Sequence, residues 1–529
     1  MQFCTGKWIA RIDSDDISSI NRLKKQIEVS QKLDNIGLIG SDAIFIDKLG
    51  KKLFEFSYPS NHEELKNNFS LEYHFHLGLR LLNYQKINYD ETLKYLNQAF
   101  LNLEKEKHYF IYIELANIAK IQKKYYLVIK YINKALSINK NNYQAIFNLG
   151  NTYKLIGNKR KAISNYEKAL KIKKDFIPAL HNLSLLQTEN GNIDLSIEYY
   201  KEIIKIDKKA FDSRFNLGCL YLLKGDYKNG WDEYECRFKK RFPVLPSMIP
   251  NLEKWQGEKL KKGDKLLVIS EQGLGDTIQF MRYVKFLTEK NIDISFFAQE
   301  KLKGIIISSK ITKNFFSTNH LDTINCTKWI PLLSLPKWLE VNPQNPIIYK
   351  SYVKAETTKL KKWAKILRKE SSKIIIGINW QGDLNHEKNN LKGRSIKLEK
   401  FKEIFKDLDV DLISLQKGHG SEQLRNCSFG ERFLKCQEEI NNTWSFSDTA
   451  AIVLNCDLII TIDSAMAHLS AALGQKTWVF LKKIPDWRWG LYGEDSFWYE
   501  SMKLYRQEKI EEWDTPLSKM KKDLKELLN

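Results

Sequence analysis

The chain has 529 residues, of which 43% are hydrophobic and 12% aromatic, so it can bury more than one hydrophobic core and we expect two or three domains. Its 85 basic and 64 acidic side chains give a net charge of +21, but the lysines are spread along the whole chain, so the charge does not by itself predict a specific nucleic-acid site. Seven cysteines without a C-x-x-C pair, no apolar run of about 18 residues and no leader-like segment after Met1 predict a cytoplasmic protein without a transmembrane segment.

The first segment with recognisable chemistry is acidic. An apolar run at residues 8–12 ends in "DSDD", in which Asp13 and Asp15 stand one residue apart. Two carboxylates at a strand end can hold Mg²⁺ or Mn²⁺ against a diphosphate. The segment resembles the metal-binding centre of family 2 glycosyltransferases of the GT-A fold, with Asp13 and Asp15 at the DxD positions. The resemblance is confined to residues 1–70 and begins in mid-domain, so the alternative is a truncated α/β fragment that binds no metal.

A fixed period of 34 residues follows. It relates three sets of residues: Leu115, Leu149, Leu183 and Leu217; Gly157, Gly191 and Gly225; and Tyr166, Tyr200 and Tyr234. A helix-turn-helix unit of this length, with glycine at the turn, is the tetratricopeptide repeat pattern. We therefore expect an all-α superhelix over residues 71–242, with units that begin near Tyr109, Tyr143, Ile177 and Phe211. The concave face of such an array suits a protein or peptide partner, and a purely structural spacer is the alternative.

The proline-rich stretch at residues 243–250 ends the helical pattern, and α/β units follow it. Strand, turn and helix signals recur from Lys265 and again from Lys373, the turns falling after apolar, β-branched runs. The pattern predicts two Rossmann-like halves at about residues 260–370 and 371–510, within a domain of residues 243–529. Ligands of such folds bind at the carboxyl ends of the strands.

The clearest of these units is "NCDLIITIDSAMAHLSAALGQKTWVFL" at residues 455–481. A buried strand at residues 458–462 leads through a very short turn into a helix, and residues 477–481 form the next strand. The turn directs the N–H groups and positive end of the helix beyond the strand, where a phosphate would fit. The alternative is an ordinary crossover in which Asp463 caps the helix and His468 is a satisfied, partly buried histidine.

Five motifs in order make the resemblance specific: "GLGDTIQFMRYV", "GINWQG…GRSI", "SLQKGHGSEQL", "DTAAIVLNCDLIITIDSAMAHLSAALG" and "PDWRWGLYGEDSFWYESMKLYRQ". Together with the repeats they resemble bacterial proteins that fuse tetratricopeptide repeats to a family 9-like, heptosyltransferase-like glycosyltransferase domain of the GT-B fold. The resemblance implies that Asp276 is the general base for the acceptor hydroxyl. It also implies a set of residues that bind the nucleotide-sugar donor: Arg394, Glu422, Asp463, Ser464, Ala465, Met466, Ala467 and His468. Such sites require no metal.

Each implied role has a structural alternative. Asp276 can be a helix cap, Arg394 a member of a surface ion pair, and Glu422 a solvated helix residue. For the aromatic stretch 487–489 we expect packing rather than a sugar contact. The sequence thus predicts a cytoplasmic, inverting glycosyltransferase whose repeats recruit a protein acceptor or partner.

The first alternative to this function is a non-catalytic repeat scaffold with degenerate transferase domains. The second is a nucleic-acid binder driven by charge alone, whose affinity would fall steeply with salt. The sequence specifies neither the nucleotide base, nor the sugar, nor the acceptor.

Overall fold

The computed structural model describes residues 108–261, 263–317, 325–383, 387 and 393–528, together with the backbone of two short strands near the N-terminus. These strands, β1 (Ala43–Ile46) and β2 (Lys52–Phe56), pair antiparallel. Asp13 and Asp15, the residues of the predicted DxD motif, lie outside the described residues. The chain divides into two compact units, residues 1–162 and 163–529.

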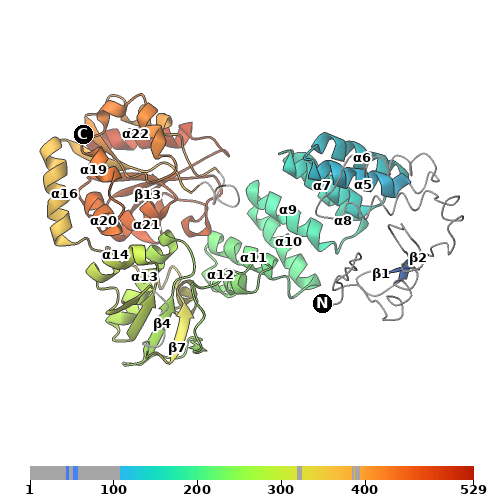
Figure 1. Ribbon diagram of the computed structural model, residues 1–529, viewed down its shortest axis with the longest axis horizontal. Helices are drawn as coiled ribbons and strands as arrows, with labels where there is room; N and C mark the ends of the chain where they lie inside the picture. Colours follow the sequence, from blue (N-terminus) through green and yellow to red (C-terminus); the bar gives the residue numbers. More distant parts are fainter. Residues whose placement is uncertain are drawn as a thin grey trace, which may run out of the picture. The chain divides into compact units, whose positions relative to one another are not determined.

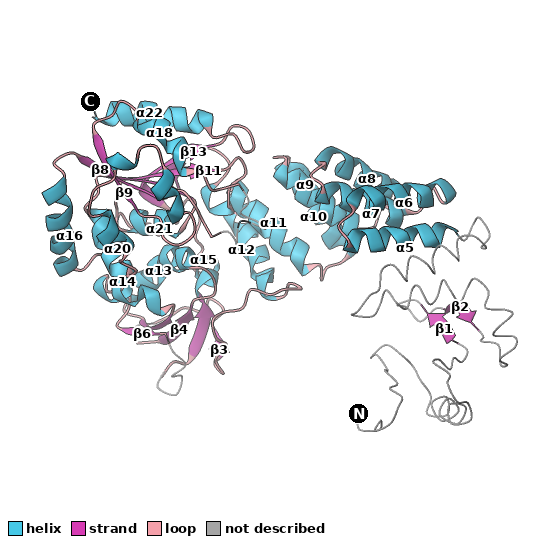
Figure 2. Cartoon of the chain, turned by 45° about the horizontal axis from the view of Figure 1, so that its top comes forward, coloured by secondary structure: helices cyan, strands magenta, loops and turns pink. Residues whose placement is uncertain are grey.

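Antiparallel helix pairs follow the N-terminal strands, as the ribbon in Figure 1 and the cartoon in Figure 2 show. They are α5 (His108–Ile121), α6 (Tyr125–Ile138), α7 (Tyr143–Leu155), α8 (Lys159–Ile172), α9 (Ile177–Glu189), α10 (Ile193–Ile206), α11 (Phe211–Lys224) and α12 (Tyr227–Tyr234). A short 3-10 turn, η1 (Glu235–Phe238), extends the last pair. The first helices of the pairs begin within one residue of the positions predicted from the 34-residue period.

The residues that repeat every 34 positions explain the pairing. The leucines and tyrosines of the period are buried between the helices. Gly157, Gly191 and Gly225 end the first helix of three successive pairs with φ of 79°, 87° and 86°, a left-handed conformation that residues with a Cβ rarely adopt. The periodic glycines therefore set the turn, and the periodic apolar residues set the packing.

The first α/β half contains a parallel five-stranded sheet in the order β3-β7-β4-β5-β6. Its strands are β3 (Glu253–Lys254), β4 (Lys265–Ile269), β5 (Asp293–Phe297), β6 (Asn314–Phe316) and β7 (Lys328–Pro331). The helical elements after them are α13 (Leu274–Glu289), η2 (Glu300–Leu302), α14 (Lys303–Ser308), η4 (Leu332–Ser334), α15 (Leu335–Trp338) and α16 (Thr357–Glu370). Strand β4 begins at Lys265, where the apolar run predicts it, and the run after Lys265 is buried.

The second half contains a six-stranded sheet in the order β12-β13-β11-β10-β8-β9, parallel except for the β12–β13 pair. Its strands are β8 (Ile374–Ile378), β9 (Val410–Ser414), β10 (Leu458–Ile462), β11 (Thr477–Leu481), β12 (Asp495–Ser496) and β13 (Tyr499–Arg506). The helical elements are η5 (Leu398–Phe401), α18 (Lys402–Phe405), η6 (Ser421–Asn426), η7 (Gly430–Arg432), α19 (Gln437–Asn441), α20 (Phe446–Leu454), α21 (Ala465–Ala472), η8 (Trp487–Trp489) and α22 (Asp514–Leu528).

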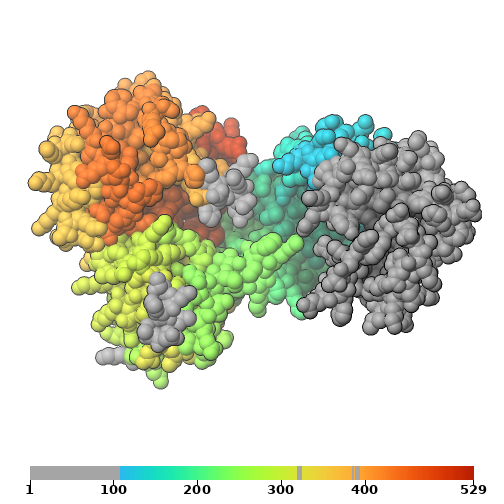
Figure 3. All heavy atoms as spheres, in the orientation of Figure 1, coloured from blue at the N-terminus to red at the C-terminus, as the bar shows by residue number. Residues whose placement is uncertain are grey.

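The two α/β halves pack through helices of both: α13 lies against α21, and α14 lies against α20. Figure 3 shows the orange atoms of the second half directly above the yellow-green atoms of the first. The hydrophobic core at this seam also contains residues of α10, α11 and α12, among them Tyr200, Leu217 and Trp231. The last repeats and the α/β halves therefore share one core, while the predicted boundary at residue 242 stays a prediction.

Within the described residues, no helix combines the length and the apolar character needed to span a membrane.

Candidate functional site

Two helix N-termini meet where the α/β halves face each other. Helix α13 follows strand β4, and helix α21 follows strand β10. Gly275, in the first turn of α13, is so close to α21 that a Cβ added to it would lie 3.2 Å from the Cα of Ala465 and 3.1 Å from the Cδ2 of His468. Because α13 and α21 each begin beyond the carboxyl end of a strand, the junction lies at the edges of both sheets where Rossmann-like folds bind ligands.

Asp276 lies in the first turn of α13 and has two partners. Its Oδ2 accepts a hydrogen bond of 3.0 Å from the backbone N–H of Gly273, which caps the helix. Its Oδ1 accepts a short hydrogen bond from Nη2 of Arg488. Burial raises the pKa of Asp276, Arg488 opposes that rise, and the nearby Asp486 adds to it. Asp276 therefore caps the helix while its side chain is still 22% exposed to solvent.

Arg488 is the buried centre of this ion cluster. Its side chain is only 8% exposed, and its Nη1 lies 2.7 Å from Oδ1 of Asp486. Its Nε donates to the side-chain oxygen of Gln279, on α13, at 2.8 Å. Arg488 thus connects the loop after β11 to helix α13. The sequence analysis placed Arg488 in a packing stretch and did not predict its pairing with Asp276, although an arginine amid buried tryptophans is itself a sign of a buried partner.

The start of α21 is capped by Ser464 rather than by Asp463. The Ser464 hydroxyl accepts from the N–H of Met466 at 3.3 Å, and the N–H of Ala467 donates to the Ser464 carbonyl at 3.1 Å. Ala465 and Met466 are half-buried, whereas the methyl group of Ala467 is fully buried. An anion at this helix start would contact backbone groups and the Ser464 hydroxyl. It would not contact the side chain of Ala467, because that methyl group is buried.

Arg394 lies beside the same helix start. Its Nη1 donates to the backbone carbonyl of Asp463 at 3.0 Å, and its Nε lies 3.3 Å from Oε1 of Glu387. Burial raises the pKa of Asp463 to about 6, and while Asp486 adds to this rise, Arg394 opposes it. The structure therefore brings together Arg394 and Asp463, which the sequence separates by 69 positions.

Glycine 382 makes room for Arg394. A Cβ on Gly382 would collide with the guanidinium group, whose Cζ and Nε would be only 2.5 Å away. The flat guanidinium group therefore lies over the Gly382 backbone. Gly382 is the last residue of the motif "GINWQG", and the motif alone does not show that this glycine faces Arg394.

A layer of polar side chains joins the carboxyl ends of β8, β9 and β10. Asn379 donates through Nδ2 to Oε1 of Gln416 at 2.8 Å. Its Oδ1 accepts from the hydroxyls of Ser464, at 3.0 Å, and Thr461, at 3.1 Å. Sequence reasoning missed Asn379 and Gln416, although a polar amide directly after an apolar strand is the signal that marks them. The layer fixes the three strand ends on which the site is built.

Glu422 belongs to the 3-10 turn η6 and is exposed. The next residue, Gln423, donates through Nε2 to the side-chain oxygen of Gln381 at 2.8 Å, which holds the turn beside the loop after β8. Glu422 is thus at the carboxyl edge of the second sheet, on its solvent side.

His468 is buried on the inner face of α21. Its Nδ1 lies 3.0 Å from the hydroxyl of Tyr499, and its ring stacks on Trp489 with centroids 5.2 Å apart. This environment agrees with the alternative expectation of a satisfied histidine. Burial, with the positive charges of Arg488 and Arg282, holds the pKa of His468 well below its usual value.

His468 gives a testable pH dependence. Because its folded-state pKa is lowered, the neutral ring stabilises the fold above about pH 6.5, and this contribution is lost as the pH falls and protons bind the unfolded chain. We expect the melting temperature to fall between pH 7.5 and 5.5 more steeply in the unmodified chain than in His468→Gln. The exposed His419 provides the control, since His419→Gln should leave the slope unchanged. Equal slopes in all three proteins would contradict a lowered pKa of His468 in the folded chain.

The aromatic stretch around Arg488 packs as the sequence predicts. Trp487 makes edge-to-face contacts with Trp231, at a centroid distance of 5.4 Å, and with Tyr234, at 5.6 Å. These contacts join the loop after β11 to the last repeat helix.

Comparison with known proteins identifies the repeats. A family model of the tetratricopeptide repeat matches residues 143–176 and 177–209. A search of the curated proteins finds no match.

Among solved structures, the chain is similar to MamA from Desulfovibrio magneticus RS-1, with 17% identity over 31% of this chain and 91% of that chain and a TM-score of 0.28. It is similar to YrrB, described as a tetratricopeptide repeat protein with an unusual peptide-binding site, with 14% identity over 33% and 89% of the chains and a TM-score of 0.28. A repeat protein from Parabacteroides merdae is 19% identical over 31% of this chain and 64% of that chain, with a TM-score of 0.29.

Proposed function

We propose that the α/β halves form a GT-B-type glycosyltransferase that moves a sugar from a nucleotide-diphosphate donor to an acceptor hydroxyl. The observation that carries the proposal is the contact between the start of α13 at Gly275 and the start of α21 at Ala465 and His468. This contact brings Asp276 beside residues 463–468, to which Arg394 bonds through the Asp463 carbonyl. The resemblance assigns all of them to one site, and they lie at the carboxyl ends of β4 and β10.

The proposed reaction is a direct displacement. The acceptor oxygen forms a bond to the anomeric carbon while the bond from that carbon to the diphosphate oxygen breaks. Asp276 takes the proton of the acceptor hydroxyl, and the nucleoside diphosphate leaves with the electron pair. Arg394 and the positive end of α21 stabilise the negative charge that develops on the diphosphate. In this proposal the site works without a metal ion, and Glu422 hydrogen-bonds the ribose.

We further propose that the repeats deliver a protein acceptor or partner. A pocket of about 530 Å³ lies between the α9–α10 turn at Gly191 and the loops that follow β11 and β13, where Ile484, Tyr492 and Arg506 line it. The strand ends beside this pocket belong to the same sheet as the candidate donor site. A peptide segment held by the repeats would therefore approach the candidate donor site from this side.

A non-catalytic repeat scaffold is the second candidate function. One observation favours it: both carboxylate oxygens of Asp276 are engaged, one by Gly273 and one by Arg488. A scaffold would bind its protein partner through the repeats and be indifferent to the charge of Asp276.

A thermal-shift screen tests the donor site. We expect one of UDP, ADP, GDP or CDP, or a sugar conjugate, to raise the melting temperature in the presence of EDTA. Binding at a hundredfold excess over Kd stabilises the native state by about 2.7 kcal/mol. Arg394→Ala should lose the shift. Arg368→Ala, which removes an exposed ion pair with Asp457 at the opposite end of the strands, should keep it. A shift that EDTA abolishes, or that survives Arg394→Ala, would contradict the proposed site.

The Gly382→Ala variant tests the placement of Arg394. The added methyl would displace the flexible guanidinium group without creating a core cavity, so we expect the melting temperature without ligand to change little. Nucleotide affinity should fall about tenfold, equivalent to 1.4 kcal/mol. Gly430→Ala is the control, because a Cβ there meets only the Cys427 sulfur at 3.8 Å. Unchanged affinity in Gly382→Ala would remove Arg394 from the donor site.

A further inference from the structure

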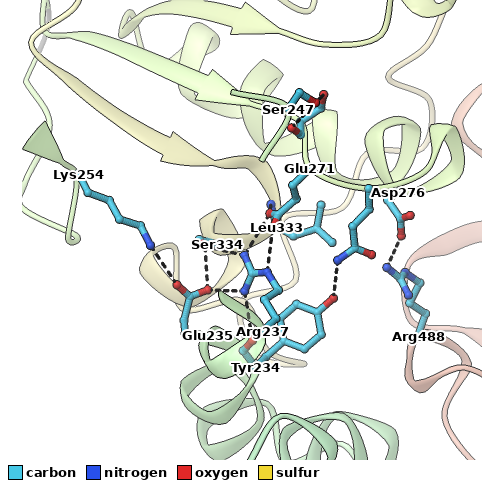
Figure 4. A network of polar contacts seen from close by, with 12 residues as sticks. Tyr234, Glu235, Arg237, Ser247, Lys254, Glu271, Asp276, Leu333, Ser334 and Arg488 are labelled. Atoms are coloured by element: carbon cyan, nitrogen blue, oxygen red, sulfur yellow. Dashed lines mark hydrogen bonds and ion pairs between the residues drawn. The ribbon is translucent and has the colours of Figure 1, made fainter. Parts of the chain in front are cut away.

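The last repeat contacts the α/β halves through residues 227–238, which comprise α12 and η1 and are called here the terminal repeat segment. Figure 4 shows its residues Tyr234, Glu235 and Arg237 beside the loop that carries Glu271, with Asp276 in the helix that follows. The loop, residues 270–273, connects strand β4 to helix α13. The terminal repeat segment is thus adjacent to the start of the helix that presents the proposed base.

Arg237 forms a forked ion pair with Glu271. Its Nε and Nη2 lie 2.8 Å and 3.0 Å from the two carboxylate oxygens of Glu271, and both side chains are fully buried. Nη2 also donates to the hydroxyl of Ser334 at 2.7 Å, and Nη1 lies 2.6 Å from Oε1 of Glu235. A bidentate pair in this environment fixes both position and orientation.

The same loop is held at a second point. Gln272, the residue after Glu271, donates through Nε2 to the hydroxyl of Tyr234 at 3.2 Å. Glu271 also accepts from the backbone N–H of Leu333 at 2.9 Å. Gly273, which follows, makes the cap hydrogen bond with Asp276. The contacts therefore run without a gap from Arg237 to the Asp276 carboxylate.

The terminal repeat segment also contacts the loop after β11, in the second α/β half. Trp231 and Tyr234 pack on Trp487, and the next residue, Arg488, pairs with Asp276. The indole of Trp231 donates to the carbonyl of Val341 at 2.9 Å. One short segment of the repeat array thus contacts both loops that meet at Asp276.

We propose that the terminal repeat segment is a positioning element of the candidate site, in which Arg237 fixes the loop at residues 270–273 and through it the carboxylate of Asp276. This inference rests on the proposed function for its effect on turnover, but the fixing of the loop is independent of it. The repeat array then serves the site directly as well as through any partner that it binds.

The test replaces the buried ion pair by an apolar pair in the full chain. Arg237→Met alone would leave Glu271 as an unpaired buried charge, so the double variant Arg237→Met/Glu271→Met is used. The control is Arg214→Met/Glu233→Met, which removes a forked ion pair between α11 and α12, with Nε–Oε2 of 2.7 Å and Nη2–Oε1 of 3.0 Å. Within the part of the chain that the structure describes, neither side chain of that pair hydrogen-bonds to the loop at residues 270–273.

Amide hydrogen exchange is the first readout. We expect exchange in the peptide that covers residues 270–276 to accelerate about tenfold or more in the Arg237/Glu271 variant, while β8 and β10 stay protected. The control variant should leave this peptide unchanged. Tyr234→Phe removes only the hydroxyl bonded to Gln272, and it should give a smaller acceleration of exchange in the same peptide. This variant can be measured even if the double variant does not fold. Unchanged exchange in both the Arg237/Glu271 variant and Tyr234→Phe would overturn the proposal.

Turnover is the second readout. With the nucleotide sugar selected by the thermal-shift screen, kcat of the Arg237→Met/Glu271→Met variant should fall about tenfold or more. Its KM for the donor should stay within about twofold of the unmodified chain, because Arg394 is unchanged. A fall in donor affinity with unchanged kcat would overturn the positioning role. If the unmodified chain shows no transfer at all, the proposed function fails, and hydrogen exchange still decides whether Arg237 fixes the loop.

Discussion

Replacing Asp276 by asparagine should reduce kcat by about 10²- to 10⁴-fold, the range that a positioned general base contributes. Asparagine keeps a side-chain oxygen to accept from Gly273, so the helix cap is retained while the proton acceptor is lost. Donor affinity should remain within about twofold, since Asp276 bonds Gly273 and Arg488 and is not part of the Arg394 contact. Single-turnover kinetics with saturating donor measure the two quantities separately.

The control for Asp276→Asn is Asp457→Asn. Asp457 also pairs with an arginine, Arg368, and accepts from the backbone N–H of Ile375 at 2.8 Å, but it precedes β10 and so lies at the opposite end of the strands. It should leave kcat unchanged. Full activity in Asp276→Asn would exclude the carboxylate as the base and favour the scaffold function.

The second large effect is expected at Arg488. Arg488→Met removes the positive partner of Asp276 and Asp486 and leaves two carboxylates in a buried cluster. Breaking a buried pair from one side costs about 3–5 kcal/mol, so the free energy of unfolding at pH 8 should fall by this amount. Denaturant unfolding measures it, and Arg368→Met, which breaks an exposed pair, should cost no more than about 1 kcal/mol.

The loss in Arg488→Met should depend on pH in a defined direction. Burial and the charge of Asp486 raise the pKa of Asp276, and Arg488 opposes them, so without Arg488 the folded-state pKa of Asp276 should lie further above its value in the unfolded chain. Stability is then greatest below the unfolded pKa and is lost as the pH rises through the folded pKa, so the variant should recover part of its stability between pH 8 and 5. A loss of stability that is constant with pH would contradict the carboxylate cluster.

The sequence predicted those parts of the fold that have a local signal. Strands β10 and β11 have the expected bounds because runs rich in apolar residues end abruptly at Asp463 and at Lys482. The repeat helices begin where a 34-residue period places them. The N-terminal cap of α21 was predicted in kind, though the residue that bonds is Ser464.

The ion pairs of the site were not predicted, because their partners are far apart in the sequence. Arg488 and Asp276 are separated by 212 positions, and Arg237 and Glu271 by 34. A single charged residue in an aromatic or linker-like stretch has no local pattern that names its partner. The role of Gly382 was hidden for the same reason, since only the packed structure brings Arg394 above it.

A crystal structure of the chain with the nucleoside diphosphate that the thermal-shift screen selects would locate the donor. We expect the diphosphate within hydrogen-bonding distance of Arg394 and of the α21 start at Ser464 and Ala465, with Asp276 facing the position of the transferred sugar. A nucleotide bound elsewhere, with Arg394 still bonded to the Asp463 carbonyl and to Glu387, would contradict the proposed donor site.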